Sequence, residues 1–241
     1  MPVSLVVRTW NLYHGRTHPV TGRTHLRRMV ELVTEDRPDV VGLQEVPLWA
    51  LGRLERWSGM AVRWAVTVPS LLLGPLARVV TELNPIRLRS LLTGQANALL
   101  LGSGLVSGEE RVLHLNPDVT KWQWLVTRGP QRRYCHAVEV SGAGPPFVVA
   151  NLHATNEPRA AAGEVERAAD LVTDASRCVL LGDFNAPRFA PAGFSGAIDG
   201  IDQILVRGLE FEQAPAAWPP DRRRLGDVLL SDHAPVEAVI A

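Results

Sequence analysis

The sequence predicts an α/β fold, and three observations lead to that prediction. Val3–Trp10 is a β-rich run, and His25–Glu35 has apolar residues spaced for one helical face. Asp39–Val46 then reads as a second, mostly apolar strand. This succession of strand, helix and strand resembles an α/β repeat, although the sequence does not determine strand direction. Later runs such as Val179–Leu181 lack polar alternation, which is typical of strands buried on both faces.

The bulk composition is that of an ordinary globular protein. The chain has 241 residues, of which 46% are hydrophobic and 21% charged, enough to bury a core without disulfides or a structural metal. The length allows one large domain or two small ones. We expect a single domain over residues 1–241, because no linker, repeat or low-complexity segment interrupts the chain. The 25 basic and 25 acidic residues balance, which argues against strong non-specific capture of nucleic acid but permits a local basic patch.

The ends and the cysteines predict a cytoplasmic protein. Met1 leads directly into a β-rich run, without the basic and apolar segments of a secretory leader. No stretch supplies the roughly 18 apolar residues of a membrane span. Cys135 and Cys178 follow no metal or redox spacing, so we expect reduced, buried thiols, with a disulfide as the alternative. No obligate protein partner is evident.

The middle of the chain predicts one further helix and one ambiguous segment. Pro47–Trp64 is expected to be helical, because its leucines and Trp57 recur at helical spacing. Residues 69–93 are apolar but broken by prolines and Gly74. Short helices over the core are the expected interpretation, and a lid or an apolar flap facing a substrate is the functional alternative.

The remaining elements follow from the same patterns. Strands are expected at Asn97–Leu101, Arg111–Leu115, Arg133–Val140, Phe147–Ala154, Ile201–Val206 and within Ser231–Ile240, and a helix at Pro158–Ala175. A polar loop carrying Trp122 and Trp124 separates two of these strands.

The stretch Cys178–Pro187 carries the clearest sign of a functional site. Gly182 and Pro187 mark the end of an apolar strand, and Asp183 and Asn185 project from the same side of an extended chain. Both side chains need partners if they are buried. A site is one explanation, and an Asx-type turn is the other.

Five other strand-like runs also end in, or contain, polar groups. They are Asn11, Glu45, His153, Asp202, and Asp232 with His233. Each unsatisfied buried polar group costs on the order of 1–3 kcal/mol, so the repetition predicts that these ends converge. Clustered carboxylates repel and raise one another's pKa values, which a divalent cation relieves. Oxygen ligands of this kind suit Mg²⁺ or Mn²⁺ better than zinc.

In this order, the motifs resemble the endonuclease/exonuclease/phosphatase superfamily, whose members include DNase I. The matching pieces are Thr-Trp-Asn11, Leu-Gln-Glu45, Asn-Leu-His153, Gly-Asp183-Phe-Asn185, Ile-Asp202 and Ser-Asp232-His233. The resemblance implies a four-layer α/β sandwich, in which two mainly antiparallel or mixed β-sheets pack face to face between helices. It corrects the simple α/β repeat suggested by the first strands, since mixed or antiparallel pairing is then expected.

The resemblance also implies hydrolysis of phosphate esters with a bound metal. Glu45 would be the main ligand of Mg²⁺ or Mn²⁺, assisted by Asn11 and Asp232. Asp183 would orient or deprotonate the attacking water, and Asn185 would hold it.

Two histidines complete the implied catalytic set. His233 would contact the phosphoryl oxygens, with its tautomer determined by Asp202. His153 is a candidate general acid for the leaving oxygen.

The loops say less about the substrate. His14 and Arg16, just behind Asn11, are the expected substrate contacts. Arg132 and Arg133 are interpreted as a solvated surface pair, with phosphate contact by Arg133 as the alternative. Arg222–Arg224 is interpreted as a charged loop, or else as a phosphate patch.

The expected function is therefore a metal-dependent phosphodiesterase. A nuclease acting on DNA or RNA is the first hypothesis, because the His153 and His233 pair resembles that of DNase I. A phosphodiesterase or phosphatase for a lipid or small molecule is the alternative, supported by the balanced charge and the apolar residues 69–93. A catalytically silent binding module on the same fold is the third hypothesis.

Overall fold

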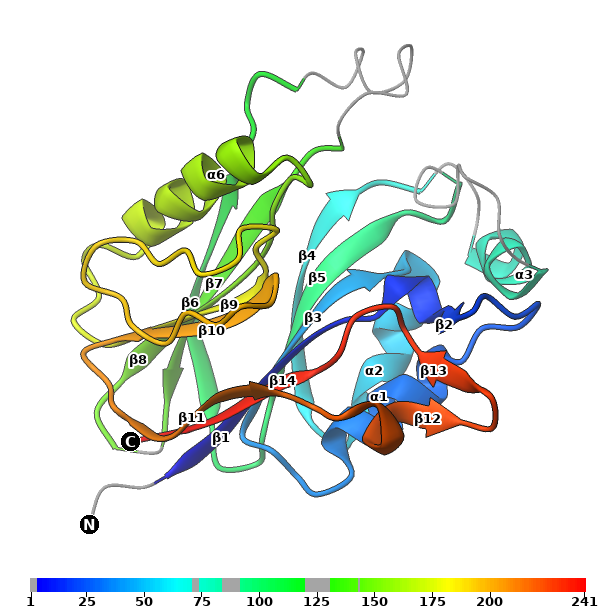
Figure 1. Cartoon of the computed structure of the whole chain (residues 1–241), viewed down its shortest axis with the longest axis horizontal. Helices are drawn as coiled ribbons and strands as arrows, with labels where there is room; N and C mark the ends of the chain where they lie inside the picture. Colours follow the sequence, from blue (N-terminus) through cyan, green and yellow to red (C-terminus); the bar gives the residue numbers. More distant parts are fainter. Residues whose placement is uncertain (1–3, 71–73, 84–91, 120–130, 143) are drawn as a thin grey trace.

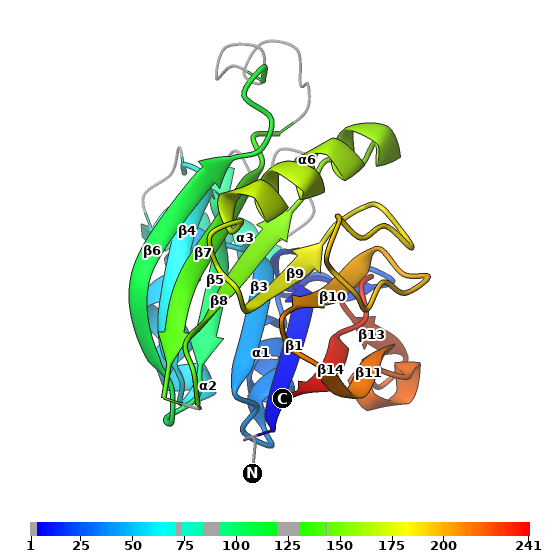
Figure 2. The same cartoon turned by 90° about the vertical axis from the view of Figure 1, so that its left-hand side faces the viewer.

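Two β-sheets lie face to face, with helices on their outer sides (Figures 1 and 2). The computed structural model describes residues 4–70, 74–83, 92–119, 131–142 and 144–241. Within these ranges the elements, with η for 3₁₀-helices, are β1 (Leu5–Asn11), η1 (Tyr13–Gly15), β2 (Thr17–His18), α1 (Leu26–Thr34), β3 (Val40–Val46), η2 (Leu48–Ala50), α2 (Leu51–Ser58), β4 (Ala61–Val68), α3 (Gly74–Leu83), β5 (Gln95–Leu101), β6 (Val106–His114), β7 (Tyr134–Ser141), β8 (Phe147–His153), α6 (Pro158–Leu171), β9 (Cys178–Asp183), β10 (Asp202–Arg207), β11 (Phe211–Ala217), η3 (Pro220–Arg223), β12 (Arg224–Leu225), β13 (Val228–Leu230) and β14 (Val236–Ile240).

Strand pairing confirms the predicted sandwich of mixed sheets. Among the described residues, one sheet has the order β11-β14-β1-β3-β5-β4 and the other β10-β9-β8-β7-β6. A small third sheet has the order β12-β13-β2. In the described ranges β1 with β3 and β8 with β9 pair in parallel, and the other strand pairs are antiparallel.

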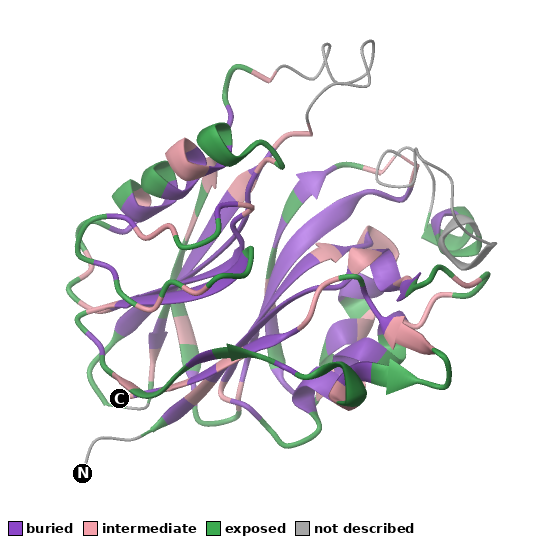
Figure 3. Ribbon diagram, viewed as in Figure 1, coloured by how far each residue is buried: buried purple, intermediate pink, exposed green. Residues whose placement is uncertain are grey.

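Apolar clusters of described residues fill the spaces between the four layers. Trp10, Met29, Leu43 and Leu54 pack between α1, α2 and the first sheet; Val7, Leu99, Val149 and Leu181 pack between the sheets; and Leu152, Val165, Leu180 and Phe184 pack between the second sheet and α6. Figure 3 shows the strands of both sheets as largely buried. Full burial of such a side chain contributes roughly 1.5–3 kcal/mol, so the layers are held mainly by apolar contact.

Hydrogen bonds between two amide side chains cross the space between the sheets. Asn151 on β8 donates from Nδ2 to the carbonyl oxygens of Leu43 (3.1 Å) and Ala98 (2.8 Å) in the opposite sheet. Its Oδ1 accepts a bond of 2.7 Å from Nε2 of Gln44, which also donates to Thr9 Oγ1 at 3.0 Å. The side chains of Gln44 and Asn151 therefore join the two sheets.

Two glycines permit the close approach of neighbouring backbones. A Cβ at Gly182 would lie 1.9 Å from the Leu152 carbonyl oxygen, and its φ of +137° also disfavours other residues. A Cβ at Gly42 would lie 2.1 Å from Leu181 Cδ1 in the facing sheet. Gly182 therefore brings β8 against β9 immediately before Asp183.

The predicted helix over Pro47–Trp64 is wrong in its last part. The helix α2 ends at Ser58, because Gly59 adopts φ +69° and terminates it with a left-handed residue. Ala61–Val68 is instead the strand β4, which pairs along β5. Backbone pairing with a distant strand overrides the local helical spacing here.

Smaller differences concern the element ends. The helix α6 stops at Leu171 rather than Ala175, and β6 begins at Val106 rather than Arg111. The strand β11 was not predicted, since Phe211–Ala217 contains Pro215 and is an edge strand where proline is tolerated.

The ambiguous segment at 69–93 contains one described helix, α3. Its Ala77 is buried, whereas Leu76 and Val79 are 58% and 48% exposed. The expected short helix is therefore present, and its described apolar side chains include both buried and exposed ones. Residues 71–73 and 84–91, like the loop with Trp122 and Trp124, lie outside the described residues.

Both cysteines are buried and free, as expected. Burial raises the pKa of the Cys178 thiol to about 12, and burial likewise raises that of Cys135. In the part of the chain that the structure describes, no helix is long and apolar enough to cross a membrane.

A buried arginine joins the first sheet to α1. Arg8 on β1 is 2% exposed and donates from Nη1 to the Val33 carbonyl oxygen at 2.7 Å. Its guanidinium also bonds Asp36 at 2.5 and 2.6 Å and Glu237 at 2.7 Å. The hydrogen bond from Arg8 is the main cause that lowers the pKa of Asp36.

We expect Arg8→Met to lower the free energy of unfolding by about 2–3 kcal/mol, because Glu237 and the Val33 carbonyl lose a buried donor. Asp36 is 51% exposed and can be rehydrated, which keeps the loss below that of a fully buried pair. Urea denaturation measures it. The depressed pKa of Asp36 makes its contribution present above the unfolded-state pKa near 4 and lost as pH falls through the folded-state value. The difference in free energy of unfolding between the wild type and Arg8→Met should therefore become smaller in acid.

Arg188→Met is the matched control, since Arg188 is 76% exposed and pairs with an exposed Asp199. It should change the free energy of unfolding by no more than about 0.5 kcal/mol. Equal losses in both variants would contradict a special role for the buried arginine.

Candidate active site

Three neighbouring strands place His153, Asp183 and Asp202 in one row. His153 is the partner of Asp183 in the parallel β8–β9 ladder, and Asp202 is its partner in the antiparallel β10–β9 ladder. Adjacent strands lie about 4.8 Å apart, so the three side chains are neighbours. Strand order, rather than sequence spacing, thus collects these groups.

The other sheet contributes Asn11 and Glu45 to the same place. Asn11, the last residue of β1, donates from Nδ2 to Asp183 Oδ2 at 2.9 Å. Glu45 lies at a β-bulge in β3 and has φ +55°, which redirects its side chain. His14 Nε2 lies 3.4 Å from Glu45 Oε2. In Figures 1 and 2, the ends of β1 and β9 lie side by side, in accordance with this bond.

Asp183 is the most enclosed carboxylate of the row, with 2% of its surface exposed. Burial, and next the neighbouring Asp202 carboxylate, raise the pKa of Asp183 to about 7 against the charge of His233. Its Oδ2 lies 3.3 Å from His153 Nε2 and 3.9 Å from His233 Nε2. A carboxylate with a pKa near neutrality is suited to accept a proton in a catalytic step.

Asn185 follows in a turn that is also part of the cluster. Its backbone nitrogen donates to Asp183 Oδ1 at 3.3 Å, which is the Asx-type contact considered as the alternative to a site. Its side chain donates from Nδ2 to the Ala154 carbonyl oxygen at 3.1 Å and does not bond Asp183. Asn185 has φ +50°, a conformation that asparagine tolerates better than most residues. The Asx-type turn is therefore part of the polar cluster rather than an alternative to it.

His233 is held by Asp202 across the cluster. Its Nδ1 lies 2.8 Å from Asp202 Oδ2, as the resemblance implied, which leaves Nε2 facing Asp183 and Asp232. Burial lowers the pKa of His233, but the hydrogen bond and charge of Asp202, helped by Asp183 and Asp232, raise it to about 10. The ring is therefore a cation at neutral pH.

The loop Ser231–His233, between β13 and β14, is held by several buried groups. Ser231 Oγ donates to the Asn11 carbonyl oxygen at 2.7 Å and accepts from the His233 nitrogen at 3.1 Å. Trp10 Nε1 donates to the His233 carbonyl oxygen at 3.0 Å. Ser231 has φ +62°, and the Arg16 carbonyl oxygen accepts its N–H at 2.9 Å. Arg16 thus supports this loop through its backbone.

Arg223 was not predicted as part of the site. It is buried and donates from Nη1 to the carbonyl oxygens of Leu230 (3.2 Å) and Ser231 (2.9 Å). Burial lowers the pKa of the Arg223 guanidinium, against the nearby charges of Asp232 and Asp202. Neither a charged loop nor a phosphate patch describes this residue. The run Arg222–Arg224 signals basic character, but the sequence does not identify which arginine is buried.

Arg133 is buried, so its interpretation as part of a solvated surface pair is wrong. Its Nη1 contacts His153 Nε2 at 2.9 Å, and its Nη2 donates to Asn156 Oδ1 at 3.1 Å. A guanidinium can only donate, so this contact assigns the lone pair to Nε2 of His153. Burial, and then the charge of Arg133, hold the pKa of His153 well below its usual range. Arg132, by contrast, is half-buried beside Tyr134.

The oxygen atoms around Glu45 fit a hard divalent cation. Burial raises the pKa of Glu45, and the charge of Asp232 raises it further, while Asn11 and two cations lower it. A metal ion would relieve this strain between carboxylates. Asp183, Asp202 and His233 also place ligand atoms within 4.8 Å of one another. Their contacts to Asn11 and to each other already use several of these atoms, and Asn11 is engaged as well, since its Oδ1 accepts from the Tyr13 N–H at 3.0 Å. The assignment of a metal to Glu45, Asn11 and Asp232 stays a prediction.

The described backbone is strained where these motifs meet. Of the non-glycine residues with positive φ in the described ranges, Tyr13, His14, Glu45, Asn185 and Ser231 lie in or beside the motifs. Such conformations cost of order 1–3 kcal/mol each and cluster at functional sites.

Comparison with known proteins places the same residues in a family. The model of the Endonuclease/Exonuclease/phosphatase family matches residues 9–233, which include all the predicted site residues. No curated protein sequence matches the chain. Because the structural similarities below are at less than 25% identity, they show the fold.

Three solved structures illustrate that fold. An endonuclease/exonuclease/phosphatase from Beutenbergia cavernae has TM-score 0.74 and 18% identity over 99% of this chain and 71% of that chain. A functionally unknown conserved protein from Enterococcus faecalis has TM-score 0.70 and 16% identity over 98% of this chain and 99% of that chain. D. rerio TDP2 complexed with single strand DNA product has TM-score 0.68 and 13% identity over 99% of both chains.

We expect Arg223→Met to lower the free energy of unfolding by about 2 kcal/mol, because the loop carbonyls of Leu230 and Ser231 lose their buried donor. Arg224→Met is the neighbouring control, since Arg224 is exposed and pairs with an exposed Asp221. It should change stability by less than about 0.5 kcal/mol in urea denaturation. Indistinguishable urea midpoints for the two variants would show that the hydrogen bonds from Arg223 to the loop carbonyls do not stabilise the fold.

Proposed function

The chain belongs to the endonuclease/exonuclease/phosphatase family of metal-dependent phosphoesterases, and on that premise we propose that it is a phosphodiesterase that cleaves strands of nucleic acid. The observation that carries the proposal is the row His153, Asp183 and Asp202, closed by Asn11 from the other sheet and by His233 on Asp202. It combines a proton acceptor, a fixed cation and oxygen ligands in one place. In this proposal residues 1–241 act as one domain.

Asp183 is the proton acceptor in the proposed reaction. It takes a proton from the water whose oxygen forms the new bond to phosphorus, while the bond from phosphorus to the leaving oxygen breaks. Asn11 Nδ2 and the Asn185 N–H orient its two oxygens. Its pKa near 7 keeps it partly deprotonated at neutral pH.

His233 and Arg133 supply positive charge to the phosphoryl oxygens. Asp202 holds the His233 ring so that Nε2 faces Asp183, where a phosphoryl group would enter. Arg133 Nε has no hydrogen-bond partner among the described residues, and the guanidinium interacts with the charges of Glu45 and Asp183. Donors placed in advance against developing charge are a main source of catalysis.

We propose a different role for His153 from that of the general acid first expected. Its contact with Arg133 and its depressed pKa keep the ring neutral. We therefore assign His153 to positioning Arg133 beside Asp183, with Asn156 as the second anchor of the guanidinium.

Glu45, Asn11 and Asp232 would hold Mg²⁺ or Mn²⁺. The ion would act as a Lewis acid on the phosphoryl oxygen and neutralise developing charge. His14, against Glu45, keeps that carboxylate in place rather than contacting the substrate directly. Arg16 acts likewise through its backbone bond to the Ser231 loop.

A lipid phosphodiesterase is the second candidate, because Leu76 and Val79 on α3 are exposed apolar side chains. A panel of substrates separates the two. Cleavage of single-stranded oligonucleotides and of bis(4-nitrophenyl) phosphate, but not of sphingomyelin vesicles, supports the nuclease. The opposite preference supports the lipid enzyme.

We expect Asp183→Asn to lower kcat by about 10²- to 10⁴-fold on any phosphodiester, because the amide cannot accept the proton. His233→Ala should cause a comparable loss by removing the cation. Asp174→Asn is the matched control, since Asp174 is an exposed partner of Arg111, and it should retain full activity. Near-normal rates in a folded Asp183→Asn protein would exclude Asp183 as the base.

We expect EDTA to abolish activity and Mg²⁺ or Mn²⁺ to restore it. Glu45→Gln should raise the metal concentration for half-maximal activity by tenfold or more, because the neutral amide binds the cation more weakly. A loss of roughly 1.4 kcal/mol in binding free energy corresponds to each factor of ten. Glu166→Gln, at an exposed position of α6, is the control. Full activity in EDTA would overturn the metal assignment.

A further inference from the structure

We propose that a groove formed by η2, α2 and α3 binds the nucleic acid strand that continues from the carboxylate cluster, an inference that rests on the proposed function. The groove has a volume of about 560 Å³. It is lined by Trp49, Arg53, Gly74, Pro75, Arg78 and Val79, and we call it the Trp49 groove. Its size is within the range of pockets that hold small organic groups.

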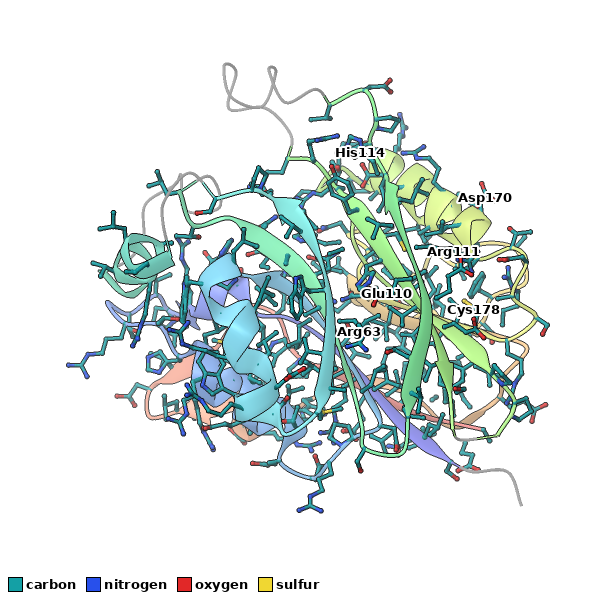
Figure 4. The ribbon with its side chains drawn as sticks, turned by 180° about the vertical axis from the view of Figure 1, so that it is seen from behind. Arg63, Glu110, Arg111, His114, Asp170 and Cys178 are labelled. Carbon is teal, nitrogen blue, oxygen red and sulfur yellow. The ribbon has the colours of Figure 1, made fainter. Side chains whose placement is uncertain are left out.

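The charge of the lining favours an anionic ligand. Among the described residues that line it, Arg53 and Arg78 are charged and there is no carboxylate. A cavity of about 250 Å³ elsewhere is lined by Arg111 and Arg177 but also by acids, including Asp174, which pairs with Arg111. Figure 4 shows Arg111 on β6, at the edge of the second sheet. In a chain with no net charge, the Trp49 groove is thus a local basic site, which attracts polyanions.

The same residues form a surface on which bases can stack. The guanidinium carbon of Arg53 lies 5.4 Å from the centroid of the Trp49 ring, and that of Arg78 lies 5.9 Å from it. Trp57 supports the ring edge-on, with centroids 6.2 Å apart. Single-stranded nucleic acid is bound by this combination of aromatic rings, guanidinium planes and positive charge.

The position of the groove suits a strand that continues from the cluster. Trp49 lies in η2, four positions after Glu45, so their Cα atoms are at most about 15 Å apart. The turn is firmly packed: a Cβ on Gly94 would lie 2.7 Å from Leu48 Cδ1. Trp49, the aromatic ring of the groove, is therefore joined to Glu45 by a short, packed turn.

A membrane surface is the competing ligand, because Leu76 and Val79 are exposed on α3. The described lining combines two arginines with Trp49, which suits a nucleic acid strand better than an apolar membrane surface does. The strand is favoured for this reason.

The test compares kcat/KM for a single-stranded oligonucleotide and for bis(4-nitrophenyl) phosphate in the metal-loaded enzyme, at several salt concentrations. Arg53→Ala/Arg78→Ala should lower the ratio of oligonucleotide to small-diester activity by roughly tenfold or more, since each arginine contributes a charged hydrogen bond. The salt dependence should also become shallower by about 1.4 in log–log slope, about 0.7 for each lost phosphate contact.

Two further variants keep the test decisive. Arg53→Lys/Arg78→Lys retains the positive charge but not the planar guanidinium. It should keep the slope of the salt dependence and show a smaller decrease in the ratio of oligonucleotide to small-diester activity. Arg27→Ala/Arg188→Ala removes two exposed arginines elsewhere and should change neither. Circular dichroism and urea midpoints confirm that each variant folds.

Three outcomes would overturn the inference. An unchanged ratio in the alanine variant, with the wild type cleaving the oligonucleotide, overturns the groove and leaves the proposed function standing. A wild type that hydrolyses the small diester but no oligonucleotide overturns both. Loss of binding to phosphatidylserine vesicles, with no change on the oligonucleotide, assigns the groove to a membrane surface instead.

Discussion

The hydrogen bonds that Asn151 and Gln44 make across the sheets are the constraint on which the site depends. Asn151 satisfies two carbonyl oxygens of the facing sheet and the Gln44 amide at once. A shift of either sheet would leave these buried groups unpaired, at about 1–3 kcal/mol each. Glu45 follows Gln44 directly, and His153 follows Asn151 by two positions. The alignment that satisfies the amides therefore also determines where the reacting groups meet.

Several charged groups of the cluster lie where water is largely excluded, whereas the Asp232 side chain is 38% exposed. Four carboxylates, Glu45, Asp183, Asp202 and Asp232, outnumber the cationic groups of Arg133, Arg223 and His233. Burial and mutual repulsion raise the pKa values of Glu45 and Asp183, whereas the same carboxylates raise that of His233. These groups thus lie in unequal electrostatic environments, as the proposed acid–base chemistry at neutral pH requires.

Structural and functional explanations of one motif are compatible here. Asp183 and Asn185 form an Asx-type contact, and Asp183 also bonds Asn11 from the other sheet. The turn aims the carboxylate, and the positive φ of Asn185 lets the chain leave the strand at once. Arg133 shows the reverse case, because a residue with an unremarkable local sequence becomes central once β7 lies beside β8.

Much of the molecule follows from the sequence alone. Residue type and short-range spacing predict the apolar strands, the helix α1 and the polar residues at the strand ends, and the order of the family motifs is also read from the sequence. Tertiary structure decided that Ala61–Val68 is a strand, that Arg223 rather than its neighbours is buried, and that His153 faces Arg133. Each of these depends on pairing or burial between residues far apart in the chain. Local spacing carries no information about such contacts, because the desolvation and hydrogen bonding that determine them arise only when the layers assemble.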